Sequence, residues 1–131
     1  MWKRRGYITI VVCCLLSLAW ATPGLDWDKL GERTVNHAVD RDEIKVTIKE
    51  GTFSKIKFKV KRAKVTFRDV KVHYANGGVQ DVQLRRQIPA GGETRVIDLQ
   101  GDERIITKVV FWYNTRRLLG RRAIVELWGR D

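Results

Sequence analysis

The chain has few of the residues on which small catalytic or disulfide-bonded proteins depend. Its two cysteines are adjacent and lie within the first 21 residues, and its two histidines, His37 and His73, are far apart in sequence. After residue 21 only one serine remains, Ser54, and no Gly-x-Ser-x-Gly motif surrounds it. A serine or cysteine nucleophile is therefore not expected, nor is a zinc site, which usually needs three or four His, Cys or carboxylate ligands. No disulfide is expected within residues 22–131.

The first 21 residues have the three parts of a secretory signal peptide. Residues 3–5 are basic, residues 7–18 form an apolar run, and residues 19–21 (Ala-Trp-Ala) give the small-x-small cleavage pattern. The apolar run is shorter than the ~20 residues that a membrane-spanning helix needs. We therefore predict cleavage after Ala21, a single domain over residues 22–131, and a secreted or periplasmic location. Without cleavage, the segment would remain as an anchor.

One short segment, residues 55–61, alternates strictly between lysine and apolar residues. In an extended chain Ile56, Phe58 and Val60 share one side, and the lysines share the other. A helix would scatter the lysines around its circumference, so the pattern predicts a β-strand with one face on a core and the other in water. We call the lysines of this strand the lysine row: Lys55, Lys57, Lys59 and Lys61.

Other strand-like runs are separated by turns that contain Gly, Asn or Pro. They cover residues 43–49, 64–74, 79–88, 94–99, 105–113 and 123–128. The apolar phase shifts at Arg68-Asp69, which predicts a β-bulge or a break between two short strands. Residues 105–113 are apolar on both faces, which predicts a central strand.

The remaining local signals complete the predicted architecture. Glu50-Gly51 predicts a hairpin turn before the lysine row, and residues 27–30 are compatible with one helical turn. With seven or eight strands and no long helix, the sequence predicts an all-β fold, a single antiparallel β-sandwich. A closed β-barrel is the alternative.

Carboxylates are scattered through the chain and form no recognisable catalytic motif. Residues 40–43 (Asp-Arg-Asp-Glu) faintly resemble a calcium loop, but they lack its glycine and distal glutamate, which favours a polar turn before a strand. Nothing singles out two acids as a glycosidase pair, and so small a domain has little room for a deep cleft. We predict no catalytic residue, no metal site and no cofactor. A small cell-wall hydrolase is the weakest alternative.

Cationic residues dominate the chain: 26 Lys and Arg stand against 15 Asp and Glu, for a net charge of +11. The lysine row places ammonium groups about 6.6 Å apart, which suits a polyanion, and arginine suits bidentate anion binding. The predicted anion-binding residues are Lys55, Lys57, Lys59, Lys61, Arg116, Arg117, Arg121 and Arg122. Arg62 and Lys64 extend the row, and Arg85-Arg86 forms a third basic cluster. The alternative is that the charge only keeps the domain soluble.

Three tryptophans follow the predicted signal peptide: Trp27, Trp112 and Trp128. A sugar-stacking platform is one interpretation of them. Packing in the core is the favoured one, because Trp112 lies in the most apolar run, and because Trp27 and Trp128 lie near the two ends of the domain, where they can pack together.

Four sequence blocks resemble a family of small secreted bacterial proteins with a domain of unknown function. The blocks are Trp27-x-x-Leu30-Gly31-x-Arg33-x-Val35, Asp40-Arg41-Asp42-x-Ile44, Gly91-Gly92-Glu93-Thr94-Arg95-x-Ile97-Asp98-Leu99-x-Gly101 and Val125-x-Leu127-Trp128-Gly129. The chain is also distantly similar to the YaaI-type periplasmic proteins. The resemblance implies a bacterial envelope protein with a β-sandwich-like fold, and it brings no activity, ligand or catalytic residue.

These features together predict a secreted or periplasmic, non-enzymatic binding domain. Its expected ligand is an anionic envelope component or membrane surface: lipopolysaccharide, anionic lipid or acidic polysaccharide. Nucleic acid is not an expected partner outside the cytoplasm. The alternative is a protein-interaction or accessory module of the envelope, which would dock through a sheet edge or through residues 116–122.

Overall fold

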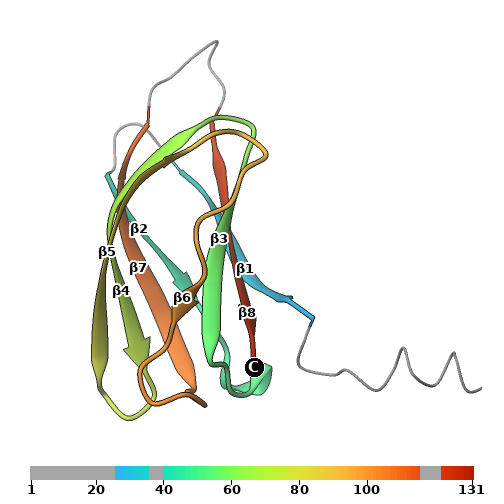
Figure 1. Ribbon diagram of the computed structural model, residues 1–131, viewed down its shortest axis with the longest axis vertical. Helices are drawn as coiled ribbons and strands as arrows, with labels where there is room; N and C mark the ends of the chain where they lie inside the picture. The colour runs from blue at the N-terminus through green and yellow to red at the C-terminus, as the bar shows by residue number, and fades with distance from the viewer. Residues whose placement is uncertain (1–25, 36–39, 116–121) are drawn as a thin grey trace, which may run out of the picture.

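Eight strands in two packed layers make up the part of the chain that the structure, a computed structural model, describes: residues 26–35, 40–115 and 122–131 (Figure 1). The strands are β1 (Asp28–Thr34), β2 (Arg41–Lys45), β3 (Lys55–Lys61), β4 (Val65–Tyr74), β5 (Val79–Ile88), β6 (Ile97–Asp98), β7 (Ile106–Asn114) and β8 (Ile124–Arg130). A short 3-10 helix, η2 (Ile48–Glu50), lies between β2 and β3. Within these described ranges, no helix has the length and apolar character needed to cross a membrane.

The strands form two four-stranded antiparallel sheets that face each other. Sheet A has the order β1-β8-β3-β6, and sheet B has the order β2-β7-β4-β5. Among the described strands each sheet keeps two open edges, so the fold is a sandwich. The predicted fold class is confirmed, and the closed-barrel alternative is wrong.

Side-chain alternation places the apolar residues of both sheets between the layers. Ile56, Phe58 and Val60 of β3 are buried, as the lysine alternation predicts. At the centre, Phe58 stacks on Phe67 of β4 with ring centroids 5.2 Å apart, and Phe111 of β7 lies 5.5 Å from Phe58. These aromatic contacts join the two sheets into one core.

Two details of the predicted strands are confirmed. The phase shift around Arg68 is a β-bulge, because three steps along β4, from Phe67 to Val70, lie opposite two steps along β7, from Tyr113 to Phe111. β7 is an interior strand, with β2 on one side and β4 on the other. Its outer face is partly covered as well, since Val110 is buried, and this explains why both faces of β7 are apolar.

Three local predictions are wrong, and the strand predicted over residues 43–49 is wrong in its second half, because β2 ends at Lys45 and residues 48–49 lie in η2. Residues 27–30 lead into β1 instead of forming a helical turn, because pairing with β8 outweighs a weak local preference. Glu50-Gly51 does not close a hairpin, since β2 belongs to sheet B and β3 to sheet A, and the chain crosses between the layers through η2. Residues 94–99 contain only the two-residue strand β6, because only two residues of β3 pair with it.

Thr94 connects the segment before β6 to β3 through a side-chain hydrogen bond, and its substitution tests this part of the fold. Its buried hydroxyl accepts a hydrogen bond from the Phe58 backbone N–H (3.0 Å) and donates one to the Arg95 carbonyl (2.9 Å). Thr94→Val keeps the shape but removes both bonds, so we expect the free energy of unfolding to fall by about 1.5 kcal/mol. Urea unfolding measures this change. Thr94→Ser keeps the hydroxyl and should recover most of the difference, so equal losses in the two variants would contradict the assignment.

Candidate functional site

The lysine row lies on the outer face of sheet A, and most of its charges are already paired. The ion pairs are Lys55–Asp98 (2.7 Å), Lys57–Glu93 (2.9 Å) and Lys61–Glu126 (3.0 Å). The carboxylates come from β8, from β6 and from the segment before β6. The prediction that the whole row meets water is wrong for Lys57, whose side chain is buried.

Two lysines of the row also lie over tryptophan rings. Lys59 Nζ is 4.1 Å from the centroid of the Trp128 ring, and Lys57 Nζ is 4.3 Å from that of Trp27. Cation–π contacts of this geometry are attractive and cover part of both groups. The predicted core packing is wrong for Trp27 and Trp128 and equally for Trp112, because all three are half-buried and outside the hydrophobic core.

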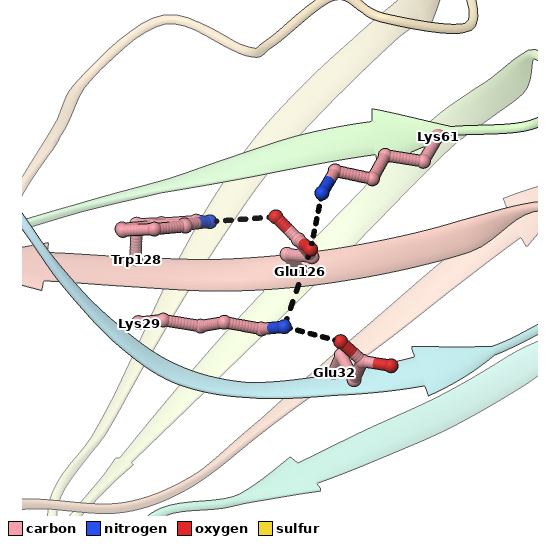
Figure 2. A network of polar contacts seen from close by, with 5 residues as sticks. All are labelled: Lys29, Glu32, Lys61, Glu126 and Trp128. Carbon is pink, nitrogen blue, oxygen red and sulfur yellow. Dashed lines mark hydrogen bonds and ion pairs between the residues drawn. The ribbon is translucent and has the colours of Figure 1, made fainter.

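Glu126 is the centre of a polar network on this outer face (Figure 2). Its side chain is only 3% exposed, although it points away from the core. Trp128 Nε1 donates to Oε1 (3.0 Å), while Lys29 and Lys61 lie 3.2 and 3.0 Å from Oε2, and Lys29 also pairs with Glu32. Burial opposes ionisation of Glu126, but the hydrogen bonds from its donors, Lys61 first among them, outweigh it and hold the pKa of the carboxyl below its usual value.

These pairs leave little free positive charge on the outer face of sheet A. An incoming polyanion would first have to displace the carboxylates of Asp98, Glu93 and Glu126. Lysines that are already paired release few counterions when an anion arrives, so they add little to its binding. The contacts therefore favour a structural role for the lysine row.

Four cations without a carboxylate partner lie on segments that meet at one end of the sandwich, where β3 turns into β4 at the upper end in Figure 1. At this end β3 is followed by β4. The pairing of Lys61 with Ile124 places the start of β8 here, and the pairing of Phe67 with Arg86 places the last residues of β5 here. Among the described residues, these cations form no ion pair. We call this group the basic end: Arg62, Lys64, Arg86 and Arg122.

Two arginines near this end hold a backbone conformation that L-residues rarely adopt. The φ angle is +76° at Arg62 and +41° at Arg85. A left-handed residue with a Cβ costs roughly 1–2 kcal/mol, a cost that glycine largely avoids. The presence of arginine at both positions is consistent with a need for the side chain, since strained residues cluster at functional surfaces.

A groove runs over β4 on the outer side of sheet B. It consists of three adjoining hollows of about 460, 310 and 430 Å³ in the described part of the chain. The first two share Arg68, Asp69 and Arg85, and the last two share Thr66. The bulge at Arg68 lies in the middle of this groove, where it locally bends the strand. We call this feature the β4 groove.

The β4 groove has an aromatic wall at one end and polar walls at the other. Trp112 of β7 lines the first hollow, and Arg41 of β2, its register partner, has its guanidinium carbon 5.7 Å from the ring centroid. Lys64, Gln87 and Asn114 line the third hollow. Because Lys64 belongs to the basic end, the groove leads from Trp112 to that end.

Three carboxylates also line the groove, those of Asp40, Asp69 and Asp81, and two of them lie near a cation. Asp81 Oδ1 is 3.5 Å from Lys71 Nζ, and Asp69 Oδ1 is 4.0 Å from Arg85 Nε. Enzymes that use a carboxylic acid as proton donor at neutral pH bury it in apolar surroundings, and none of the three aspartates is buried. Among the described residues, no three His, Cys, Asp or Glu side chains are placed to hold a metal ion.

Five of the eight predicted anion-binding residues lie within the described ranges, and they do not form one site. The lysine row follows sheet A, whereas Arg122 is exposed at the basic end. The other three, Arg116, Arg117 and Arg121, lie outside the described residues. Sequence reasoning missed Arg68 as a neighbour of Trp112, and the phase shift at Arg68-Asp69 is the one signal that points to their groove.

Comparison with known proteins supports the fold and leaves the ligand open. A family model described as Domain of unknown function (DUF2541) matches residues 8–129. Among solved structures, the chain is similar to one titled "Structural and functional characterization of Pseudomonas aeruginosa AlgX", with 12% sequence identity and a TM-score of 0.52. That match covers 79% of this chain and 27% of the other, so the chain spans about a quarter of that protein and shares its fold there. No curated protein matches the chain.

Proposed function

The chain belongs to the DUF2541 family, and we propose that it is a secreted, non-enzymatic domain that binds an anionic component of the bacterial envelope through its basic end. This proposal keeps the ligand class that the charge predicts. It moves the contact surface from the lysine row to the basic end and the adjoining β4 groove.

The observation that carries the proposal is the contrast between the cations of the lysine row and those of the basic end. Three lysines of the row are neutralised by carboxylates of their own fold, and the fourth, Lys59, lies over the ring of Trp128. Arg62, Arg86 and Arg122 are exposed and form no ion pair among the described residues. A polyanion gains most from such cations, because it replaces their solvent counterions, and arginine can hold a carboxylate or phosphate with two hydrogen bonds.

Binding of the purified protein to lipopolysaccharide, anionic liposomes and an acidic polysaccharide, measured at several salt concentrations, tests the proposal. For at least one of them we expect the affinity to fall steeply between about 50 and 200 mM salt. The double variant Arg86→Ser with Arg122→Ser should weaken that binding about tenfold, because two unpaired cations are lost from one end.

A matched control removes the same charge elsewhere. Lys45 and Lys49 also form no ion pair in the described chain, and they lie at the end of β2 and in η2, away from the basic end. Lys45→Ser with Lys49→Ser should change the affinity by less than about twofold. Equal weakening by the two double variants would mean that net charge alone drives binding, and absence of binding to every ligand at low salt would overturn the proposal.

A protein-interaction module is the second candidate, favoured by the free edge of β5. This ten-residue strand pairs with β4, and no described strand pairs with its other side. Val79 on it is 47% exposed. Arg85, however, interrupts the edge with its left-handed backbone, and bulges and charges discourage the addition of another strand. The edge therefore supports this candidate less than the unpaired cations support anion binding.

A further inference from the structure

We infer that the β4 groove binds an extended acidic polysaccharide, with Trp112 as the surface on which a sugar ring stacks and with Arg68 and Arg85 as ligands of its acidic groups. The inference rests on the proposed function and names its ligand. It also places part of the binding surface on sheet B, where the lysine row is not involved.

The shape of the groove suits a linear polymer. Its lining follows β4 from Lys71 to Thr66 and continues to Lys64 before the strand. The eight residues from Lys64 to Lys71 span about 23 Å in an extended chain. The hollows are shallow and open into one another along this line, so they match several linked sugar rings better than one compact molecule.

The aromatic wall supplies a stacking surface. Trp112 is half-buried, which leaves part of its indole facing the first hollow. Arg41 lies over the ring from the β2 side and fixes its position through a cation–π contact. A rigid, partly exposed indole with a polar rim is suited to the apolar C–H face of a sugar ring, whose hydroxyls remain free for hydrogen bonds.

The charges of the groove favour a sugar acid over a lipid surface. Arg68 is exposed and forms no ion pair among the described residues, and Arg85 approaches Asp69 only to 4.0 Å, so both guanidinium groups can take an acidic group of the ligand. Asp40, Asp69 and Asp81 would repel a surface made only of phosphates. They can accept hydrogen bonds from sugar hydroxyls, which lie beside the acidic group on every residue of such a polymer.

The rest of the lining agrees with this ligand. Thr66, Gln87 and Asn114 add a hydroxyl and two amides, groups that both donate to and accept from sugar hydroxyls. A membrane-inserting surface needs exposed apolar side chains, yet the exposed large apolar residues of the described chain are Val79 and Val96, and neither lines the groove.

The test is calorimetric titration of the full chain with linear oligomers of galacturonic acid and with a neutral glucan of equal length. We expect salt-sensitive binding of the acidic oligomer and at least tenfold weaker binding of the neutral one. Trp112→Ala and Arg68→Gln should each weaken binding of the acidic oligomer about tenfold. Trp27→Ala, which removes the same side chain from the region beside sheet A, should change it by less than about twofold.

The outcomes separate this inference from the proposed function. If the oligomer binds but neither Trp112→Ala nor Arg68→Gln weakens it, the groove is not the site, and anion binding at the basic end remains. If anionic liposomes bind and the acidic oligomer does not, the ligand class is wrong, while the proposed function survives. If no anionic probe binds, both fail. Arg68→Gln changes an exposed side chain, so it gives an answer even if Trp112→Ala unfolds.

Discussion

Phe111→Ala is expected to lower the free energy of unfolding by about 4 kcal/mol, a large part of the roughly 5–15 kcal/mol that holds a domain folded. Phe111 is fully buried at the centre of the aromatic cluster. Its ring centroid lies 5.5 Å from that of Phe58, 6.1 Å from that of Phe67 and 5.6 Å from that of Tyr113. The substitution removes contacts to both sheets at once and leaves a cavity that close-packed neighbours cannot fill.

Urea and thermal unfolding monitored by circular dichroism measure this loss. Trp112→Ala is the matched control, since it removes an even larger aromatic side chain from the next position of the same strand. Trp112 lies outside the core, so its loss should cost no more than about 1.5 kcal/mol. Equal destabilisation by the two substitutions would show that the core does not lie where the alternation of β7 places it.

Glu126→Gln is expected to lower the free energy of unfolding by about 2 kcal/mol at pH 7. The substitution keeps the shape and the hydrogen bond from Trp128 but leaves Lys29 and Lys61 without a carboxylate. The estimate is below the cost of breaking a fully buried ion pair, because both lysines are partly exposed and water can solvate them. Stability measured by urea unfolding at pH 7 tests the size of the effect.

The pH dependence of the same variant gives a second test. The pKa of Glu126 is lowered in the folded state, so the unfolded chain takes up the proton first as the pH falls. The contribution of Glu126 is complete above the ordinary glutamate pKa of about 4.3 and is lost as the pH falls below it toward the lowered folded value. The difference between wild type and Glu126→Gln should therefore shrink as the pH falls from about 5 through the ordinary glutamate pKa of about 4.3. A difference that stays constant over this range would mean that the carboxylate charge does not stabilise the fold.

Local sequence patterns predicted the strands of this fold where one face is apolar and the other is not. The alternation of residues 55–61 depends only on neighbours along the chain, so β3 and its buried face could be predicted. The bulge at Arg68 left a mark in the same pattern. β1 left none, because only Leu30 and its pairing with β8 define it, and its other residues are mostly charged or small.

The candidate site was harder to predict because partners distant in sequence decide it. A strand of lysines has the same pattern whether its charges meet water or carboxylates, and Glu93, Asp98 and Glu126 reach the lysine row only through sheet pairing. Trp112 occurs in the most apolar run, where both faces of the strand are apolar. Only the packing of β7 in the sandwich shows that Phe111 faces the core and Trp112 does not. Sequence composition therefore predicts the sign of the net charge. The pairing of the strands determines which cations have a carboxylate partner and which can bind an anion.

The strand order of sheet A has a consequence for how the protein acquires its structure. β8, the last strand of the described chain, lies between β1 and β3, so the first strand finds its partner only when the last has arrived. Closing so long a loop loses chain entropy before any contact compensates for it, which makes such a topology slow to fold. Until residues 124–130 are in place, β3 has an unpaired edge, and a chain interrupted before that point is expected to aggregate.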